Sequence, residues 1–535
     1  MADEVIEQIR ECLVKKQNFL LSGGAGSGKT HTLIQTLRNV FEHDTTARVA
    51  CITYTNVAAD EIKERSPYSK LHVSTIHDFL WEVIKGYQKN LKQALVALIT
   101  AEKSSKGTGI TYSGEVEISE KNLELIEYKN YRDLEKGIIS HDDLLKVANY
   151  MFAAYPLLSR VLCGKYDYIF IDEYQDTQRV VIDIFLSHIK EQAQDSICIG
   201  FFGDKMQSIY DSGIGNIQSF VESGDVTEVI KEDNYRCSVS VIGLLNKIRS
   251  DIQQQPSKKD VKGTIANKPG SITFVYSQNE FELEQFKKSK FVSDWAFDNP
   301  KLTKVLFLTH KLIAKRIGFE DLLNAYQYND SLIGNEPDRL AIHLLKMGSV
   351  LYHFEHKDYS HVISEIQIKL KSSSDKGKIN KLLSDLLTNQ TIDIDTMINR
   401  FNQESLVRKD DRLDTYITEH TETYDKIKAL PFTQAMAYFK YYNDYSPYST
   451  QHGIKGAEFD NVLVIMDNGR WNNYNFKYYF EKTTGKESVI SRTERIFYVC
   501  CSRAINNLVI YYPEPTSQII TQAKTLFGDS NVHSI

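Results

Sequence analysis

The sequence predicts an α/β fold with two parallel β-sheet cores, each carrying an inserted, mostly helical subdomain. The length, a repeated alternation of short apolar runs with helical stretches, and two polar interruptions of that alternation support this prediction. A single hydrophobic core stops growing at about 250–300 residues, so a chain of 535 residues is expected to contain at least two cores. Buried strands that alternate with helices are typical of parallel sheets covered on both faces.

Six apolar runs have the length and composition of buried strands. They are residues 18–21, 47–55, 166–172, 196–204, 304–310 and 459–467. A polar stretch, QQQPSKKDVKG (253–263), separates the first four runs from the last two. We expect this stretch to be the hinge between the two cores.

Two segments interrupt the alternation of strands and helices. Residues 86–139 are rich in lysine and glutamate, and residues 321–440 are polar and helical in pattern. Because each lies between strand-rich regions, we expect two inserted helical subdomains. The expected domain limits are 1–85 and 140–252 for the first core, 86–139 for its insert, 253–320 and 441–535 for the second core, and 321–440 for its insert.

Composition narrows the class of protein. The net charge of −6 is not that of a protein that coats nucleic acid, although a local groove can still bind a strand. The seven cysteines include no CxxC pair, so we expect buried free thiols rather than disulfides or a zinc site. No apolar run reaches the ~18 residues that span a membrane, and the first residues, MADEVIEQIR, are unlike a signal peptide. We expect a cytoplasmic protein without a membrane partner.

The strongest local motif is GGAGSGKT at residues 23–30, which fits the phosphate-loop pattern between a predicted strand and a predicted helix. Its glycines let backbone amides point at phosphates, and the helix N-terminus adds positive potential. We expect Lys29 to neutralise the β- and γ-phosphates of ATP and Thr30 to bind Mg²⁺. A glycine-rich turn without a ligand is the alternative. The expected ATP contacts here are Gly23, Gly24, Ala25, Gly26, Ser27, Gly28, Lys29, Thr30 and His31.

Asp172 and Glu173 end the apolar run 166–172 and open the segment DEYQDTQ. An acidic pair at the carboxyl end of a strand is the expected place for a metal ligand and a base. We expect Asp172 to hold Mg²⁺ and Glu173 to polarise the attacking water. The pair alone is a weak signal, and its position about 140 residues after the phosphate loop strengthens it.

Seven segments resemble, in order, the motifs of the UvrD/Rep/PcrA family of superfamily 1 DNA helicases. They are CITYTNVAADE (51–61), VSTIHDF (73–79), DEYQDTQ (172–178), GDKMQSIY (203–210), NYRCS (234–238), TQHGIKGAEF (450–459) and FYVCCSRA (497–504). The resemblance implies two RecA-like P-loop cores with ATP between them. It also implies ATP-driven movement along single-stranded or partly duplex DNA, with 3′-to-5′ polarity.

The resemblance also assigns residues to the ATP site. The implied catalytic residues are Lys29, Glu173, Gln207, Arg236 and Arg503, and the implied further ATP contacts are Gln8 and Glu458. An arginine supplied across a cleft stabilises the transition state and makes hydrolysis depend on closure of the cores. A solvent-facing role is the alternative for Gln8, and a surface ion pair is the alternative for Arg236.

The resemblance assigns DNA contacts to both cores. The implied contacts are Tyr54, Thr55, Asn56, Thr75, His77, Tyr210, Thr450, His452 and Lys455. Core packing is the alternative for Tyr54 and for His452. Two departures from the family are Val57, where a lysine is usual, and residues 211–215, where an aromatic residue and an arginine are usual. The aromatic residues of 468–482 are equally consistent with strand separation and with packing or a partner interface.

A second functional class fits the sequence. The segments FYVCCSRA (497–504) and ISHDDLL (139–145) resemble, more loosely, the UvrD-like helicase subunit of Gabija-type antiphage defence systems. That resemblance implies an ATPase that senses DNA or nucleotides and regulates a partner nuclease of the OLD family.

Overall fold

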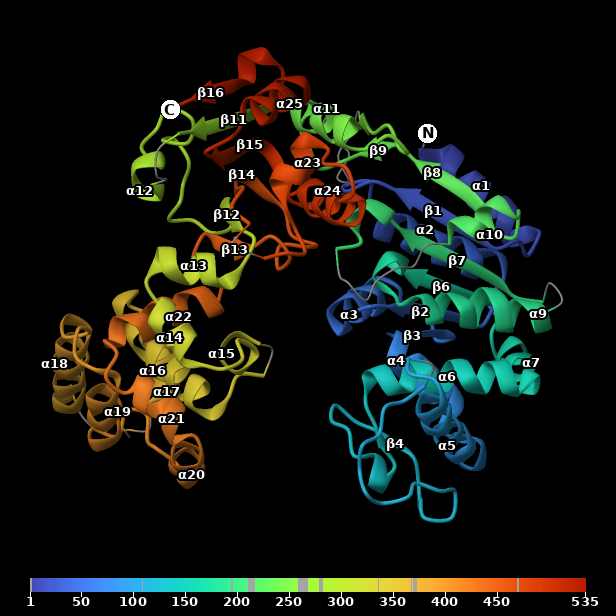
Figure 1. The fold of residues 1–535 in the computed structure, drawn as a ribbon, viewed down its shortest axis with the longest axis horizontal. Helices are drawn as coiled ribbons and strands as arrows, with labels where there is room; N and C mark the ends of the chain where they lie inside the picture. The colour runs from blue at the N-terminus through green and yellow to red at the C-terminus, as the bar shows by residue number, and fades with distance from the viewer. Residues whose placement is uncertain are drawn as a thin grey trace. The chain divides into compact units, whose positions relative to one another are not determined.

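The computed structural model describes residues 2–107, 109–193, 196–209, 217–257, 268–278, 282–334, 336–366, 368, 373–468 and 471–535. The chain divides into two compact units (Figure 1). Unit 1 comprises Met1–Gly270 and Glu494–Ser502, and unit 2 comprises Ser271–Thr493 and Arg503–Ile535. Each unit contains a six-stranded sheet whose paired strands are parallel. The predicted α/β class with two parallel-sheet cores is confirmed.

The sheet of unit 1 has the strand order β3-β2-β6-β7-β1-β8. Its strands are β1 (Phe19–Gly23), β2 (Val49–Thr53), β3 (Leu71–Thr75), β6 (Tyr168–Asp172), β7 (Cys198–Gly203) and β8 (Thr227–Lys231). Successive side chains of a strand point to opposite faces, and accordingly Phe19 and Leu21 pack in one cluster while Leu20 packs in the other. Because all six strands run in the same direction, their carboxyl ends share one edge of the sheet.

Helices cover both faces of this sheet. One cluster includes α1 (Ala2–Val14), α2 (Lys29–His43) and α3 (Asn56–Arg65). The opposite cluster includes α4 (Ile76–Ile84), α5 (Gln88–Ser104), α6 (His141–Ala154), α7 (Pro156–Lys165), α8 (Arg179–Ile182), the π-helix η3 (Asp183–Ile189) and α9 (Lys190–Ala193). The smaller elements are β4 (Glu127–Tyr128), η1 (Leu134–Lys136), β5 (Ile138–Ile139), η2 (Tyr174–Asp176), η4 (Lys205–Gln207), α10 (Gln218–Glu222), β9 (Asp233–Asn234), α11 (Val239–Ile248) and β10 (Gln255–Pro256).

The sheet of unit 2 has the strand order β13-β12-β14-β15-β11-β16. Its strands are β11 (Ser271–Ser277), β12 (Thr303–Phe307), β13 (Tyr448–Thr450), β14 (Phe459–Ile465), β15 (Ala504–Pro513) and β16 (Val532–Ser534). One face packs against α12 (Leu283–Phe286) and α13 (His310–Ile317). On the other face Phe274 contacts aromatic residues of α23 (Phe476–Glu481) and α25 (Ser517–Phe527). The remaining elements are α24 (Glu487–Cys501), whose residues from Glu494 onward belong to unit 1, and η5 (Asp529–Asn531).

A helical subdomain is inserted between β12 and β13 of unit 2 (Figure 1). Its helices are α14 (Glu320–Ala325), α15 (Asp330–Ile333), α16 (Arg339–Glu355), α17 (Tyr359–Glu365), α18 (Ser373–Thr388), α19 (Ile394–Gln403), α20 (Asp411–Glu419), α21 (Thr421–Ile427) and α22 (Phe432–Tyr442). Buried side chains such as Leu344, Met347 and Phe401 give this subdomain a core of its own.

The six predicted apolar runs overlap β1, β2, β6, β7, β12 and β14. The other six described strands of the two six-stranded sheets were not predicted. Among these, β3, β8, β13 and β16 are the edge strands of the two sheets, so fewer of their residues are buried. In β15, Asn506 and Asn507 interrupt the apolar pattern, and each donates a side-chain hydrogen bond to β14, at Asp460 (2.6 Å) and Asn461 (2.9 Å).

Other expectations have mixed outcomes. The seven cysteines are buried, as predicted. In the first insert, α5 is a regular helix, but most of the described residues of 105–137 form no regular helix.

Of the predicted hinge, residues 253–257 belong to unit 1, and residues 258–263 lie outside the described residues. Within the described ranges, no helix is both long enough and apolar enough to cross a membrane.

Candidate nucleotide and nucleic-acid sites

The phosphate loop of unit 1 connects β1 to α2. Gly26 and Gly28 both have φ of 75°, a left-handed conformation that glycine adopts without steric cost. The Lys29 side chain is 8% exposed, and its Nζ donates to the carbonyl oxygens of Gly23 (3.1 Å) and Gly24 (3.4 Å). The ammonium group is therefore held against the loop backbone, on the loop that the sequence predicts to bind phosphate.

Oxygen ligands from two elements meet beside this loop. Thr30, in the first turn of α2, donates through Oγ1 to Oδ2 of Asp172 (3.4 Å) at the end of β6. Burial, together with the adjacent Glu173 carboxylate, raises the pKa of Asp172 to about 7, so the negative charge at this position is incompletely compensated. A hydroxyl and a carboxylate are the ligands that Mg²⁺ prefers, and a divalent cation would supply the missing positive charge. The residues present fit Mg²⁺.

Glu173 has an unusual backbone conformation. Its φ is 50°, a left-handed value that is uncommon for a residue other than glycine and is found most often at functional sites. The backbone N–H of Glu173 donates to Oδ1 of Asp172 (3.0 Å), and the Gln175 side-chain amide donates to the Glu173 carboxylate. These two contacts hold the backbone N–H and the carboxylate of Glu173, the residue that the sequence predicts to polarise water.

A buried polar network that the sequence analysis did not predict joins the loop to β7 and α24. The Tyr498 hydroxyl accepts from the Ala25 backbone N–H (3.0 Å) and from Nη1 of Arg249 (2.8 Å). Arg249 also pairs with Asp204 at 3.1 Å, and both side chains are 0% exposed. Gln207 donates through Nε2 to Oδ2 of Asp204 (2.8 Å), so this predicted catalytic residue is oriented by the same carboxylate.

A second group of side chains binds the other side of the loop. Asn234 and Gln254 each donate from a side-chain amide to the Ala25 carbonyl oxygen, both at 3.0 Å. The Tyr235 backbone N–H donates to the carbonyl of Gly26 (2.9 Å). Arg236 donates through Nη1 to the carbonyl of Ser502 (3.3 Å). Ala25 therefore has both its N–H and its carbonyl oxygen paired with residues outside the loop.

The predicted ATP residues divide between the two units. The structure places Lys29, Thr30, His31, Asp172, Glu173, Gln207 and Arg236 around or beside the phosphate loop of unit 1. Gln8 is exposed on α1. Arg503 and Glu458 belong to unit 2. There Glu458 is exposed, whereas Arg503 is 1% exposed and donates through Nη1 to the carbonyl of Ala457 (3.3 Å).

Sequence reasoning missed five residues of this site. They are Asp204, Asn234, Arg249, Gln254 and Tyr498. Asp204, Asn234 and Tyr498 lie inside motif segments. In these segments a polar residue beside an apolar run could have been predicted to belong to the site. Arg249 and Gln254 lie in no motif, and only the tertiary structure brings them to the loop.

The predicted DNA contacts of unit 1 lie at the carboxyl ends of β2 and β3, where ligands bind in open α/β sheets. Tyr54 is 40% exposed, so its ring is not part of the core, and Asn56 beside it is exposed. Thr55 and Thr75 begin α3 and α4, where each accepts a backbone N–H at 3.2 Å. Tyr210 lies outside the described residues.

His77 belongs to an aromatic group on unit 1. Its ring centroid is 4.7 Å from that of His141, and the His141 ring is hydrogen-bonded to the Tyr128 hydroxyl. Burial and the neighbouring His141 lower the pKa of His77 to about 4. His77 is therefore neutral near pH 7 and would contact a DNA strand through hydrogen bonds or stacking rather than through charge.

The predicted DNA contacts of unit 2 lie near a cavity of about 510 Å³. The residues that line it include Thr450, His452, His310, Lys311, Asn329 and Trp471. The His452 Nε2 and the Tyr474 hydroxyl are 2.8 Å apart, and the Trp471 ring centroid is 5.4 Å from that of His452. His452 thus has a protein partner and also faces a cavity. Lys455, which is close to His452 in the sequence, is half-buried and does not line the cavity.

The aromatic residues of 468–482 mostly pack the domain. Tyr474, Phe476, Tyr479 and Phe480 are at most 3% exposed, whereas Trp471 is 38% exposed. Residues 476–481 form the helix α23. Of the interpretations that the sequence left open for this interval, the structure favours packing for most of its aromatic side chains. Their ring contacts with each other and with Phe274 account for the burial.

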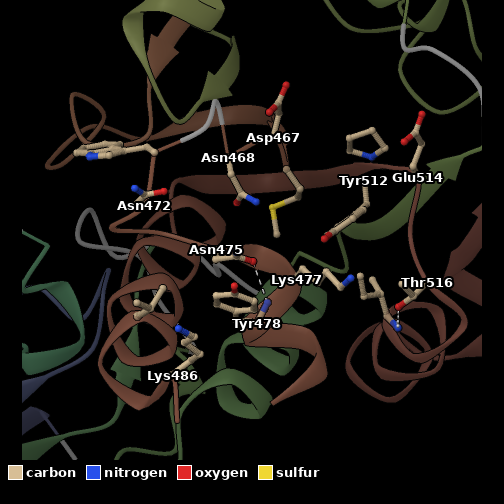
Figure 2. A pocket seen from close by; sticks show the side chains of 15 residues that line it. Asp467, Asn468, Asn472, Asn475, Lys477, Tyr478, Lys486, Tyr512, Glu514 and Thr516 are labelled. Atoms are coloured by element: carbon tan, nitrogen blue, oxygen red, sulfur yellow. Dashed lines mark hydrogen bonds between the residues drawn. The ribbon is translucent and has the colours of Figure 1, made fainter. Parts of the chain in front are cut away.

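A second cavity of unit 2, of about 620 Å³, lies beyond the carboxyl ends of β14 and β15. Figure 2 shows its lining side chains, with Asn475 accepting the backbone N–H of Tyr478 at the start of α23. Two lysines and two carboxylates line it, Lys477, Lys486, Asp467 and Glu514. The charged groups that line this cavity are thus of both signs.

Comparisons with known proteins agree with the motif pattern. A family model described as an AAA domain matches residues 7–212. The chain is 28% identical to the Gabija protein GajB of Bacillus cereus strain HuB5-5, over 98% of this chain and 97% of that protein. It is 25% identical to the Gabija protein GajB of Bacillus cereus strain VD045, over 87% of this chain and 96% of that protein.

The chain is also 26% identical to the ATP-dependent DNA helicase PcrA of Bacillus subtilis, over 57% of this chain and 47% of that helicase. It therefore spans about half the length of PcrA and nearly the full length of the two Gabija proteins. The resemblance to UvrD-like helicases and the resemblance to the Gabija-type subunit are both confirmed.

We predict that Gly26→Ala destabilises the chain more than Gly28→Ala. Both positions have φ of 75°, and a side chain in that conformation costs about 1–2 kcal/mol. A Cβ at Gly26 would also lie 2.7 Å from Cβ of Arg236 and 2.8 Å from Oδ1 of Asn234, whereas at Gly28 its nearest neighbour is at 3.7 Å. Overpacking adds about 1–3 kcal/mol at Gly26 alone. Urea unfolding without nucleotide measures the difference, and equal midpoints for the two variants would contradict it.

Proposed function

We propose that this chain is a DNA-responsive ATPase that couples ATP hydrolysis to movement along single-stranded DNA with 3′-to-5′ polarity. The observation that supports the proposal best is the group formed by Lys29, the Thr30–Asp172 contact and Glu173 around one phosphate loop. Catalysis of phosphoryl transfer depends on positioning and charge. This group supplies a cation, a Mg²⁺ site and a carboxylate.

The residues of unit 1 have separate roles in the proposed reaction. Lys29 binds the β- and γ-phosphates after leaving the Gly23 and Gly24 carbonyls. Thr30 and Asp172 would hold Mg²⁺, which would neutralise phosphate charge. Glu173, fixed by Asp172 and Gln175, orients the attacking water and accepts its proton.

The buried hydrogen-bond network connects the phosphate loop to α24, the helix that precedes Arg503 in the sequence. Tyr498 contacts Ala25 of the loop and lies on α24, which ends at Cys501, close in sequence to Arg503. A displacement of Ala25 on nucleotide binding would be transmitted to α24 through the Tyr498 hydroxyl. We propose that this contact couples the loop to Arg503, which stabilises the transition state when the two cores close.

We predict that Lys29→Ala and Glu173→Gln each abolish ATP hydrolysis. The first removes the cation that neutralises the phosphates, and the second removes the base without changing the size of the side chain. Arg503→Ala is expected to retain nucleotide binding and lose hydrolysis. The measurement is steady-state ATPase with single-stranded DNA, duplex DNA and no DNA, together with binding of a fluorescent nucleotide.

Lys15→Ala is the control for Lys29→Ala, because Lys15 is an exposed lysine of the same unit. Single-stranded DNA is expected to stimulate the wild type and Lys15→Ala alike. Full turnover in Lys29→Ala or Glu173→Gln would refute the site assignment. Full turnover in Arg503→Ala would refute the role given to that arginine.

The proposed DNA path includes Tyr54, whose exposed ring can stack on a base without regard to sequence. Stacking of a base on an aromatic side chain contributes about 1–3 kcal/mol. We therefore predict that Tyr54→Ala weakens single-stranded DNA binding by about 5- to 150-fold, while Tyr54→Phe retains most of the affinity. Val57→Ala is the control, since Val57 is 81% exposed close by. Equal affinities of Tyr54→Ala and Val57→Ala in a fluorescence anisotropy titration would contradict a stacking role.

A second function is favoured by the extent of the comparisons. The match to the Gabija protein GajB covers nearly all of both chains, whereas the match to PcrA covers 47% of that helicase. We propose that the ATPase acts within a defence complex and regulates a partner nuclease of the OLD family.

We predict that such a nuclease, encoded beside this chain, co-purifies with it and changes its DNA cleavage when ATP is hydrolysed. The nuclease is assayed alone, with the wild type and with Glu173→Gln, at matched ATP concentrations. A difference between the wild type and Glu173→Gln is expected. If the nuclease neither binds nor changes activity, the regulatory function is refuted, and DNA-stimulated ATPase of the isolated chain would still support the motor function.

A further inference from the structure

We propose that the helical subdomain of unit 2 contains a Zn²⁺ site formed by His353, Asp358 and His361. One ligand atom from each of the three residues lies within 4.8 Å of the other two. The site belongs to neither the phosphate loop nor the predicted DNA contacts. It lies where α16 ends and α17 begins.

The connection between the two helices brings the ligands together. His353 lies in the last turn of α16, His361 lies in the first turn of α17, and Asp358 is the N-cap of α17. The Asp358 backbone N–H donates to the His353 carbonyl (2.8 Å), and Lys357 between the helices has φ of 61°. The turn is thus held by the backbone, so the ligand positions do not depend on flexible side chains alone.

The two imidazoles are unusually close. Their ring centroids are 3.7 Å apart with an interplanar angle of 26°, and Nδ1 of His353 is 3.2 Å from Oδ2 of Asp358. Both rings are half-buried. The lone pairs of imidazole nitrogens lie in the ring planes, so one of these near-parallel rings must turn for both nitrogens to bind one cation together with the Asp358 carboxylate.

The chemistry of the ligands selects the ion. Two imidazole nitrogens and one carboxylate oxygen suit Zn²⁺, which binds three protein ligands and leaves a fourth position for water or another residue. Glu365 contacts His361, with its Oε1 3.5 Å from Nε2 of that residue, but it is not part of the three-residue cluster. Mg²⁺ prefers oxygen ligands in octahedral geometry, so this site is distinct in kind from the Mg²⁺ site of the phosphate loop.

Without a metal, the same residues form two histidine–carboxylate contacts, His353 with Asp358 and His361 with Glu365, which are ion pairs only when the imidazole is protonated. Such partly exposed pairs contribute little to stability. The two interpretations differ in their response to zinc. A bound ion would fasten α17 to α16, whose other face carries Leu344, Met347 and Leu351 in the core of the subdomain.

The experiment uses the full chain after treatment with EDTA and buffer exchange. ZnCl₂ is titrated against a zinc-binding dye, and the unfolding temperature is recorded with and without one equivalent of zinc, in the presence of excess Mg²⁺. We expect one Zn²⁺ per chain and a higher unfolding temperature, because a ligand that binds only the folded state stabilises it.

Two variants remove ligands in different ways. Asp358→Asn replaces the carboxylate and retains an N-cap, because asparagine caps helices as well as aspartate, and His361→Gln removes one imidazole. Each is expected to weaken Zn²⁺ binding by at least about 100-fold, because even residues outside the ligand set change metal affinity by about 10- to 100-fold. His356→Gln, which removes an exposed imidazole from the same turn, is the matched control and is expected to bind like the wild type.

The outcomes separate the metal site from the ion pairs. Loss of zinc binding in Asp358→Asn and His361→Gln, with the metal-free unfolding temperature unchanged in at least one of them, supports the site. Absence of zinc binding in the wild type overturns it. Zinc binding at wild-type affinity in both ligand variants also overturns it, since the ion would then lie elsewhere.

Discussion

The position of the phosphate loop in unit 1 depends on the pairing of one loop residue, Ala25. Its N–H binds a tyrosine of α24, and its carbonyl binds two side-chain amides from the segment after β8. The tyrosine is in turn held by the buried Arg249–Asp204 pair. Removing one partner of a buried ion pair leaves an uncompensated charge, which costs about 3–5 kcal/mol. The position of the loop is therefore set by residues that are far from it in sequence and that tolerate little change.

This dependence explains which parts of the site the sequence could predict. The phosphate loop, Thr30 and Asp172 follow from strand–loop–helix patterns that are local in the chain. The pairing of Ala25 with Tyr498 joins residues 473 positions apart, and no local pattern contains it. Gln254 is a clear example, because its polar surroundings in sequence predict a hinge, yet its side chain is buried against the loop.

The fold shows the same division between local and long-range information. Most central strands with continuous apolar runs were predicted, although β11 was not, and β15 was not because its two asparagines are polar. In the sheet these asparagines pair with polar side chains of β14, so the burial of polar groups is compensated by hydrogen bonds. The aromatic residues after β14 illustrate the opposite case, in which the sequence left packing and exposure equally open. Their composition is that of an interface, and their ring contacts with one another and with Phe274 show that most of them form a core.

The burial of every cysteine has a practical consequence for studies of motion. Thiol reagents react with accessible thiolates, and all seven native thiols of this chain are buried. A single cysteine introduced at an exposed position would therefore react selectively with a maleimide dye. Val14 in unit 1 and Tyr328 in unit 2 are 76% and 68% exposed. A donor and an acceptor dye at these positions would report the distance between the two units during each cycle of turnover, without prior removal of native cysteines.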